Sequence, residues 1–234
     1  MITRETTEFS HIDFQKGEVI LIDKQVKWTS FKVVYELRKI IDVKKVGHAG
    51  TLDPSATGLL ILCTGKKTKE ISKYQELKKS YSGIILLGKS TPSMDLETKV
   101  IEELPYQDIT EDEIITAKEE LTGKIEQIPP MYSAVKFKGK NLYKLARKGK
   151  TVERKPRQVT VYSFVLIDIK LPEIHFEIQC SKGTYIRVIA DDLGKKLGCG
   201  AVLSALRRTN IGQYSVDSAL SVNEFKERFY VETI

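Results

Sequence analysis

Cysteine, histidine and tryptophan are scarce in this chain of 234 residues, which holds three cysteines, three histidines and one tryptophan. Cys63, Cys180 and Cys199 form no CxxC pair and no even-numbered set, so we expect free thiols in a reducing compartment. With only three histidines besides, we expect no structural zinc site. These shortages exclude disulfide-stapled and zinc-finger proteins.

Long apolar runs are also absent. The longest uninterrupted one, Leu59 to Cys63, is far below the roughly 20 residues that a membrane-spanning helix requires. Residues 1–17 are polar and mixed in charge, without the basic and apolar regions of a secretory signal peptide. We therefore expect a cytoplasmic protein with no membrane partner, folded as one domain over residues 1–234.

Positive charge is concentrated in one segment. The chain has 38 Lys and Arg against 31 Asp and Glu, a net charge of +7. Residues 136–157, which we call the basic segment, hold ten basic side chains and one acidic one. The segment thus carries +9 and the remainder −2. Such a cluster indicates a polyanionic partner, although a solvated charged surface is the simpler interpretation.

Hydrophobic periodicity and capping residues predict a mixture of strands and helices. A Thr-Ser pair precedes the first expected helix, and Thr110 with Glu113 forms a capping box before the second. We expect strands at 18–23, 59–63, 80–87, 159–170 and 173–180, and helices at 31–41, 110–123, 185–197, 201–208 and from 221 onward. Strands adjacent in sequence with interspersed helices predict an α+β fold.

A glycine-rich string, Gly47-His-Ala-Gly-Thr-Leu-Asp-Pro-Ser-Ala-Thr-Gly58, contains the most informative carboxylate, Asp53. Glycines on both sides allow tight turns and leave this side chain little shielded. An Asp-Pro step alone is a common turn starter, and that interpretation needs no function. The whole string, however, resembles the catalytic-aspartate motif of TruB-type tRNA pseudouridine synthases.

The resemblance covers most of the chain, from about residue 19 to residue 214, with its blocks in the family's order. The further blocks are 127–136, 139–143, 146–147, 180–187, 191–194 and 206–208. The resemblance implies the pseudouridine synthase fold, a mixed, mostly antiparallel sheet flanked by helices with a central RNA-binding cleft. It also implies a basic RNA-binding insertion at about 124–157. Because the sequence ends at Ile234, we expect no C-terminal PUA domain.

The implied reaction isomerises uridine 55 in the T-loop of tRNA to pseudouridine. The C1′–N1 glycosidic bond is cut, the base turns, and a C1′–C5 bond forms. By resemblance Asp53 is the catalytic residue. A carboxylate can add to the sugar or the base, or assist removal of a ribose proton, with no metal or redox cofactor required. The sequence leaves these alternatives open.

Two further residues take catalytic-site roles by resemblance. Arg187 would keep Asp53 ionised, because a nearby cation lowers the pKa of a carboxyl group. Tyr81 would stack on the target base and help a proton leave C5. Stacking on an aromatic ring is worth roughly 1–3 kcal/mol, which offsets part of the cost of flipping a nucleotide out of its helix. Ordinary strand packing is the alternative for Tyr81.

Three more residues match substrate-binding positions of the family. Tyr185 offers a hydroxyl group and Leu206 an apolar wall to the uracil pocket, while His48 fills the space that the flipped nucleotide leaves. The alternative for Leu206 is an ordinary core position in a helix. Weaker matches to RNA-contacting positions are Lys69, Lys136, Tyr143 and Arg147, the last three in the insertion that closes over the tRNA T-arm.

Other functions fit less well. A nucleotide-binding P-loop would need glycine at position 60 and Ser or Thr at 67, where the chain has Leu60 and Lys67. A non-catalytic tRNA-binding or tRNA-folding protein remains an alternative, because the basic segment and the aromatic residues would serve it equally. The presence of Asp53 together with Arg187 favours the enzyme. No obligatory protein partner is implied.

Overall fold

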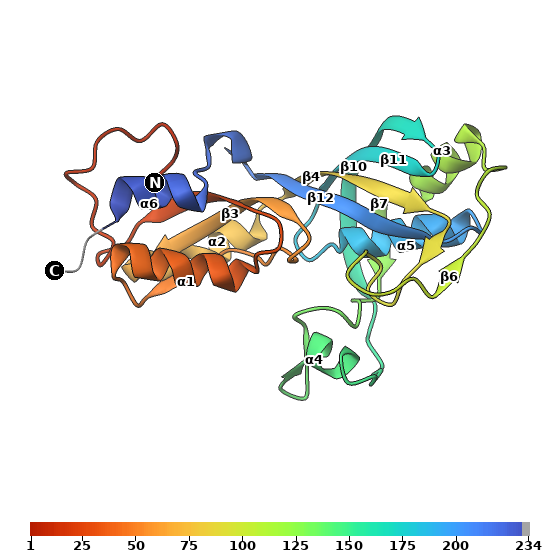
Figure 1. Ribbon diagram of the computed structural model, residues 1–234, viewed down its shortest axis with the longest axis horizontal. Coiled ribbons are helices and arrows are strands. Elements are labelled where there is room, and N and C mark those ends of the chain that lie inside the picture. Colours follow the sequence, from red (N-terminus) through yellow and green to blue (C-terminus); the bar gives the residue numbers. More distant parts are fainter. Residues whose placement is uncertain (231–234) are drawn as a thin grey trace. The chain divides into compact units, whose positions relative to one another are not determined.

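The computed structural model describes residues 1–230, and the chain forms two compact units (Figure 1). The first unit combines residues 1–81 with the part of the chain from Leu206 onward, and the second holds Ser82–Ala205. Two strands, β4 (Lys79–Leu87) and β12 (Ala201–Ile211), contribute residues to both units. Within residues 1–230, no helix has the length and apolar character to cross a bilayer.

The first unit is built on strand β3 (Thr57–Thr64). β1 (Val19–Lys24) and β2 (Val46–His48) pair with it antiparallel, and the end of β12 pairs with it in parallel. The remaining elements of this unit are α1 (Ser30–Ile41), a 3₁₀ helix (Gly65–Glu70), α2 (Ile71–Glu76), β13 (Tyr214–Ser215), a short 3₁₀ turn (Val216–Ser218) and α6 (Val222–Phe229).

Alternating side chains of β1 separate two cores in this unit. Ile20 and Ile22 point to one face of the sheet, where they pack with α1 and α6. Val19 and Leu21 point to the other face, where Tyr74 of α2 packs against the cluster. Both faces of these strands are thus covered, which explains why the sequences of β1 and β3 are continuous apolar runs.

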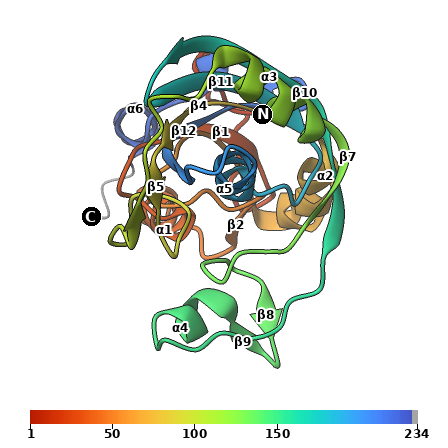
Figure 2. The same ribbon diagram turned by 90° about the vertical axis from the view of Figure 1, so that its right-hand side faces the viewer.

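The second unit is a sheet with the strand order β4, β11, β10, β7. β10 (Arg157–Lys170) and β11 (Glu173–Cys180) form a long antiparallel hairpin, and β7 (Gly123–Gln127) lies along the other edge of β10. The helices α3 (Glu111–Glu120) and α5 (Ile186–Lys196) contact each other, and α3 also contacts β10 (Figure 2). Smaller elements are β5 (Lys89–Ser90), β6 (Glu102–Glu103), β8 (Lys136–Phe137), β9 (Lys140–Asn141) and α4 (Leu142–Ala146).

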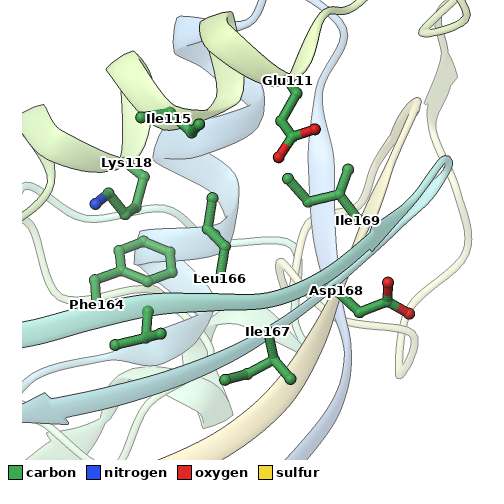
Figure 3. Close-up of a pocket in the computed structure, with 9 residues that line it drawn as sticks. Glu111, Ile115, Lys118, Phe164, Leu166, Ile167, Asp168 and Ile169 are labelled. Carbon is green, nitrogen blue, oxygen red and sulfur yellow. The ribbon is translucent and has the colours of Figure 1, made fainter.

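An open groove of about 600 Å³ lies between α3 and β10 (Figure 3). Phe164 and Leu166 point from the strand toward the helix, whereas Ile167 and Asp168 point away. The pairing of β10 with β11 shifts register between Leu166 and Asp168, and the shift reorients neighbouring side chains. None of the site residues expected from the sequence lines this groove.

Most expected elements are confirmed, and the fold is the α+β arrangement with a mostly antiparallel sheet. Thr29 caps α1, and the capping box of Thr110 and Glu113 opens α3. One expectation is wrong: residues 201–208 are not a helix but belong to strand β12. Ala, Leu and Arg in this segment are good helix formers, yet pairing within the sheet overrides that local preference. Leu206 therefore lies on a strand.

Candidate active site

The loop over residues 49–56, which we call the Asp53 loop, joins β2 to β3, and Arg208 of β12 binds its backbone. The Arg208 side chain is 2% exposed. Its Nη2 donates to the carbonyl of Gly50 at 3.2 Å, Nη1 to that of Thr51 at 3.4 Å, and Nε to that of Leu59 at 2.8 Å. One buried guanidinium therefore connects the first half of the loop to strand β3.

Gly58 of β3 allows β12 to approach β3 closely at Arg208. It has φ +105°, and a Cβ atom there would lie 2.3 Å from the carbonyl oxygen of Arg208. A side chain at position 58 would push the two strands apart and withdraw Arg208 from the loop. The last glycine of the sequence motif is thus required by the packing that holds the Asp53 loop.

Two buried side chains, one on α1 and one on β1, hold the residues next to Asp53. Ser30, at the start of α1, accepts from the Leu52 amide at 2.8 Å and donates to the Leu52 carbonyl at 3.2 Å. Lys24, which is fully buried, donates to the Pro54 carbonyl at 3.5 Å. Backbone groups on both sides of Asp53 are therefore fixed, and the half-buried carboxylate has a defined position.

His48 ends β2, directly before the loop, and is half-buried. Burial lowers the pKa of its imidazole, and the positive charge of Arg208 lowers it further, against an opposing hydrogen bond with the Gly50 backbone. Since the ordinary value is already about 6.5, the neutral form of the side chain predominates at pH 7. A neutral ring can occupy space beside RNA bases without charge-desolvation cost.

The other expected residues of the first unit lie on its strands and its 3₁₀ helix. Tyr81 on β4 and Leu206 on β12 are half-buried, and Lys69 on the 3₁₀ helix is exposed. Next to Leu206, Arg207 makes a bidentate ion pair with Asp23 of β1, with N–O distances of 3.1 and 2.7 Å. This pair anchors the part of β12 that carries Leu206.

In the second unit, Arg187 is a buried cation in a fully bonded setting. The residue is 5% exposed. Nη1 donates to the Ser93 carbonyl and Nη2 to the Tyr132 carbonyl, both at 2.8 Å, and Nε lies 3.6 Å from Oδ2 of Asp95. The Ser93 hydroxyl also donates to Asp95. Asp95 thus compensates the charge of Arg187 and helps fix the orientation of its guanidinium.

Gln127 fixes the backbone of Tyr185. The Tyr185 amide donates to Oε1 of Gln127 at 3.0 Å, and Nε2 of Gln127 donates to the Tyr185 carbonyl at 3.3 Å. Gln127 is 2% exposed, so it is a buried structural amide. Tyr185 itself is half-buried and precedes α5 as its N-cap. Sequence reasoning matched Gln127 to a family block but gave it no role.

The basic segment forms a projection of β8, β9 and α4, joined to β7 and β10 (Figure 2). Lys136 and Arg147 are exposed, Tyr143 is half-buried, and the Arg147 guanidinium lies 5.6 Å from the centre of the Tyr143 ring. Leu142 is the one residue of residues 136–157 that is buried. The segment therefore offers its cations to solvent and to a charged partner.

Metal-ligating side chains do not gather anywhere in residues 1–230: no three of His, Cys, Asp and Glu lie close enough to hold an ion. Asp53, His48, Tyr81, Leu206 and Lys69 belong to the first unit. Tyr185, Arg187 and the expected residues of the basic segment belong to the second. Each unit thus holds its own fixed group of candidate residues. Arg208, Lys24, Ser30, Asp95 and Gln127 are the residues that sequence reasoning did not place in the site, and their shared signal is a buried polar side chain.

Comparison with protein families gives two matches that together span most of the chain. Residues 38–186 match the model described as TruB family pseudouridylate synthase (N terminal domain). Residues 187–233 match the tRNA pseudouridylate synthase B C-terminal domain.

Named relatives are similar over nearly their whole length. A protein of Flavobacterium johnsoniae named tRNA pseudouridine synthase B is 45% identical over 222 residues, which are 92% of this chain and 97% of the relative. A Phocaeicola vulgatus protein of the same name is 46% identical over 222 residues, 92% of this chain and 94% of the relative. One of Chloroherpeton thalassium is 48% identical over 217 residues, 91% and 90% respectively.

Solved structures are similar in fold. A chain in the crystal structure of a Cbf5–Nop10–Gar1 complex matches with a TM-score of 0.70 and 28% identity, over 92% of this chain and 54% of that chain. A chain in an H/ACA RNP bound to a substrate RNA containing 2′-deoxyuridine matches with a TM-score of 0.68 and 26% identity, over 92% and 53%. This chain spans about half the length of those solved chains.

Proposed function

Because the chain belongs to the TruB family of pseudouridylate synthases, we propose that it isomerises uridine 55 in the T-loop of tRNA to pseudouridine. The observation that carries the proposal is the Asp53 loop, whose backbone is held on both sides of the carboxylate by hydrogen bonds with buried side chains. A reaction that exchanges one glycosidic bond for another depends on accurate placement of its reactive group.

Asp53 supplies the carboxylate for the reaction. The C1′–N1 bond breaks, the freed uracil turns, and C1′ bonds to C5. The proton that C5 loses is balanced by the one that N1 gains, so the reaction has no net redox change. Arg208 and Ser30 hold the loop before the substrate arrives, and the enzyme need not order it during the reaction.

The first unit also supplies contacts to the flipped nucleotide. Tyr81 stacks on the target base, and Leu206 forms an apolar wall of the uracil pocket. His48, predominantly neutral at pH 7, takes the place of the displaced nucleotide. Base stacking of roughly 1–3 kcal/mol is comparable to the few kcal/mol needed to unstack a nucleotide.

The second unit supplies a cation, a hydroxyl group and a phosphate-binding surface. Arg187, oriented by Asp95, is the counter-ion of Asp53 in the RNA complex, and Tyr185 contacts the uracil. Lys136, Tyr143 and Arg147 bind the T-arm, together with the other exposed cations of the basic segment. Lys69 of the first unit adds a phosphate contact.

The decisive test compares two Asp-to-Asn substitutions on unmodified tRNA transcripts. Asp53→Asn removes the carboxylate of the loop and preserves its shape, so we expect normal tRNA affinity and no pseudouridine at position 55. Asp108→Asn, an exposed position outside the site, is the matched control and should leave both unchanged. Product formed by Asp53→Asn at the rate of the unsubstituted protein would contradict the proposal. If the unsubstituted protein forms pseudouridine only at another uridine, the proposed target position is wrong.

A further inference from the structure

The outward face of α1 and of the turn before it is unusually apolar. Val26, Phe31 and Tyr35 are 50%, 65% and 47% exposed. Phe31 is the most exposed aromatic side chain in residues 1–230. A helix on the surface of a globular protein normally turns polar residues outward and apolar ones inward. Here the inward face is fully occupied by core side chains, so the outward aromatic residues are not needed for folding.

Lysine side chains lie over two of the aromatic rings on this face. Nζ of Lys32 is 4.2 Å from the centre of the Trp28 ring, and Nζ of Lys39 is 4.6 Å from the centre of the Tyr35 ring. Positions 32, 35 and 39 follow a spacing of three and four residues, which places them on one stripe of α1, while Trp28 precedes the helix and packs partly against the core. Residues 26–45 hold six basic and two acidic side chains, a net charge of +4. This is a second basic region, outside the basic segment.

The start of α1 and the turn before it are bonded to the Asp53 loop. Ser30, between Trp28 and Phe31, holds Leu52 through two hydrogen bonds, and the amide of Lys27 donates to the Pro54 carbonyl at 2.8 Å. All of these residues belong to the first unit. At 1.5 Å per residue, the stripe from residue 31 to residue 39 extends for about 12 Å along α1. The start of the helix that carries these side chains, with the turn before it, is therefore bonded directly to the backbone on both sides of Asp53.

We propose that this α1 face, formed by Val26, Trp28, Phe31, Lys32, Tyr35 and Lys39, is a second RNA-binding surface. Unpaired bases of the substrate RNA stack on Phe31 and Tyr35, and Lys32 and Lys39 contact the adjoining phosphates. The inference rests on the proposed function, since it adds a contact for the same substrate. It differs from the basic segment in chemistry, because aromatic stacking contributes to affinity as well as charge.

Charge favours RNA over the other possible occupants. Exposed aromatic residues interleaved with lysines match the two chemical features of a single strand, since every base has a stacking face and every nucleotide a phosphate. Pairing of this face with the same face of a second copy would bring like charges together, which is unfavourable.

The test measures the dissociation constant for full-length unmodified tRNA with three double variants. Phe31→Ala with Tyr35→Ala removes the exposed rings, and Lys32→Gln with Lys39→Gln removes the charges. The matched control is Tyr230→Ala with Lys226→Gln at the end of α6. Tyr230 is 55% exposed, and the Lys226 ammonium lies 5.2 Å from the centre of the Tyr230 ring. Thermal unfolding of each variant checks that the fold is retained.

We expect the aromatic variant to bind tRNA roughly tenfold more weakly, and the α6 control to bind normally. The lysine variant should lower the salt dependence of log K by about 0.7 for each phosphate that the two lysines bind. An unchanged dissociation constant for the aromatic variant overturns the proposal. If the affinity of the aromatic variant is unchanged and light scattering shows a shift from dimer to monomer, the proposal is also overturned, because the face then forms a contact between copies. A wild-type protein that binds tRNA without forming product contradicts the proposed function alone, because the affinity comparison can still be made.

Discussion

The Asp53 loop and the basic segment are held by different means. Arg208, Lys24 and Ser30, all buried, bind the backbone of the loop from β12, β1 and α1. The basic segment has one buried side chain, Leu142, and its lysines point to solvent. The chain places buried polar groups where a single carboxylate needs a defined position. It leaves exposed charge in the segment that we propose binds phosphates.

The same contrast separates two kinds of arginine. Arg208 and Arg187 are buried, and backbone carbonyls accept from both of them. Arg147 is exposed and lies beside the ring of Tyr143. A buried guanidinium with several acceptors positions other groups, whereas an exposed one is available to a partner. Variants of the two kinds should therefore fail in different measurements.

The largest expected effect comes from Arg208→Met. The substitution leaves the carbonyls of Gly50, Thr51 and Leu59 without their donor, and the loop then shifts. A displacement of about 1 Å at a reacting group can cost on the order of 100-fold in rate. We expect that reduction in the rate of single-turnover isomerisation at saturating tRNA, and a smaller reduction for Arg208→Lys, which restores the charge and one donor nitrogen.

A purely structural role for Arg208 has a different signature. In that case the thermal midpoint would fall, while the protein that remains folded would isomerise at the normal rate. Measurement of the rate well below the unfolding temperature separates the two cases. A normal rate there for Arg208→Met would remove the distinction between the fixed loop and the exposed segment.

Neutralising the basic segment should give the next largest effect, in affinity and not in placement. The triple variant Lys136→Gln, Lys140→Gln, Lys148→Gln removes three exposed charges. Each lysine that binds a phosphate should account for about 0.7–0.9 of the slope of log K against log salt concentration, or about 2.1–2.7 if all three bind RNA. The slope is measured as tRNA affinity between low and moderate salt. An unchanged slope would show that these lysines do not bind phosphate.

The sequence was sufficient for elements whose signals are local. Hydrophobic periodicity and the Thr29 cap predicted α1, and the segments that form β10 and β11 were also predicted as strands. It failed for β12, because Ala201–Arg208 contains helix-forming residues that pair within the sheet. Pairing partners distant in sequence decide such a segment, and periodicity carries no information about them.

Site residues divide in the same way. Asp53 stood out through its glycine-rich motif and the resemblance that the motif carries. Arg208, Lys24 and Gln127 did not, because no local pattern distinguishes a buried polar side chain from an exposed one of the same type. Their role depends on carbonyls that lie about 30 to 160 residues away in the chain. Only the folded structure brings these donors and acceptors together.

The smallest expected effect concerns the pH dependence of stability. It tests whether water is excluded from His48, the residue before the Asp53 loop. The pKa of His48 is lower in the folded protein than in the unfolded chain, chiefly because of burial. As the pH falls below about 6.5, the unfolded chain therefore binds a proton that the folded protein resists. Stability contributed by this group is present at neutral pH and declines as the pH approaches the lowered folded-state pKa.

Replacing the imidazole removes that contribution to the slope. The free energy of unfolding in urea should fall less steeply between pH 6.5 and pH 5 for His48→Asn than for the unsubstituted protein. His11→Asn is the matched control, since that histidine is exposed, and it should leave the slope unchanged. Equal slopes for His48→Asn and the unsubstituted protein would mean that the imidazole is hydrated. The start of the Asp53 loop would then be as accessible to water as the basic segment, although Arg208 holds the loop backbone by buried hydrogen bonds.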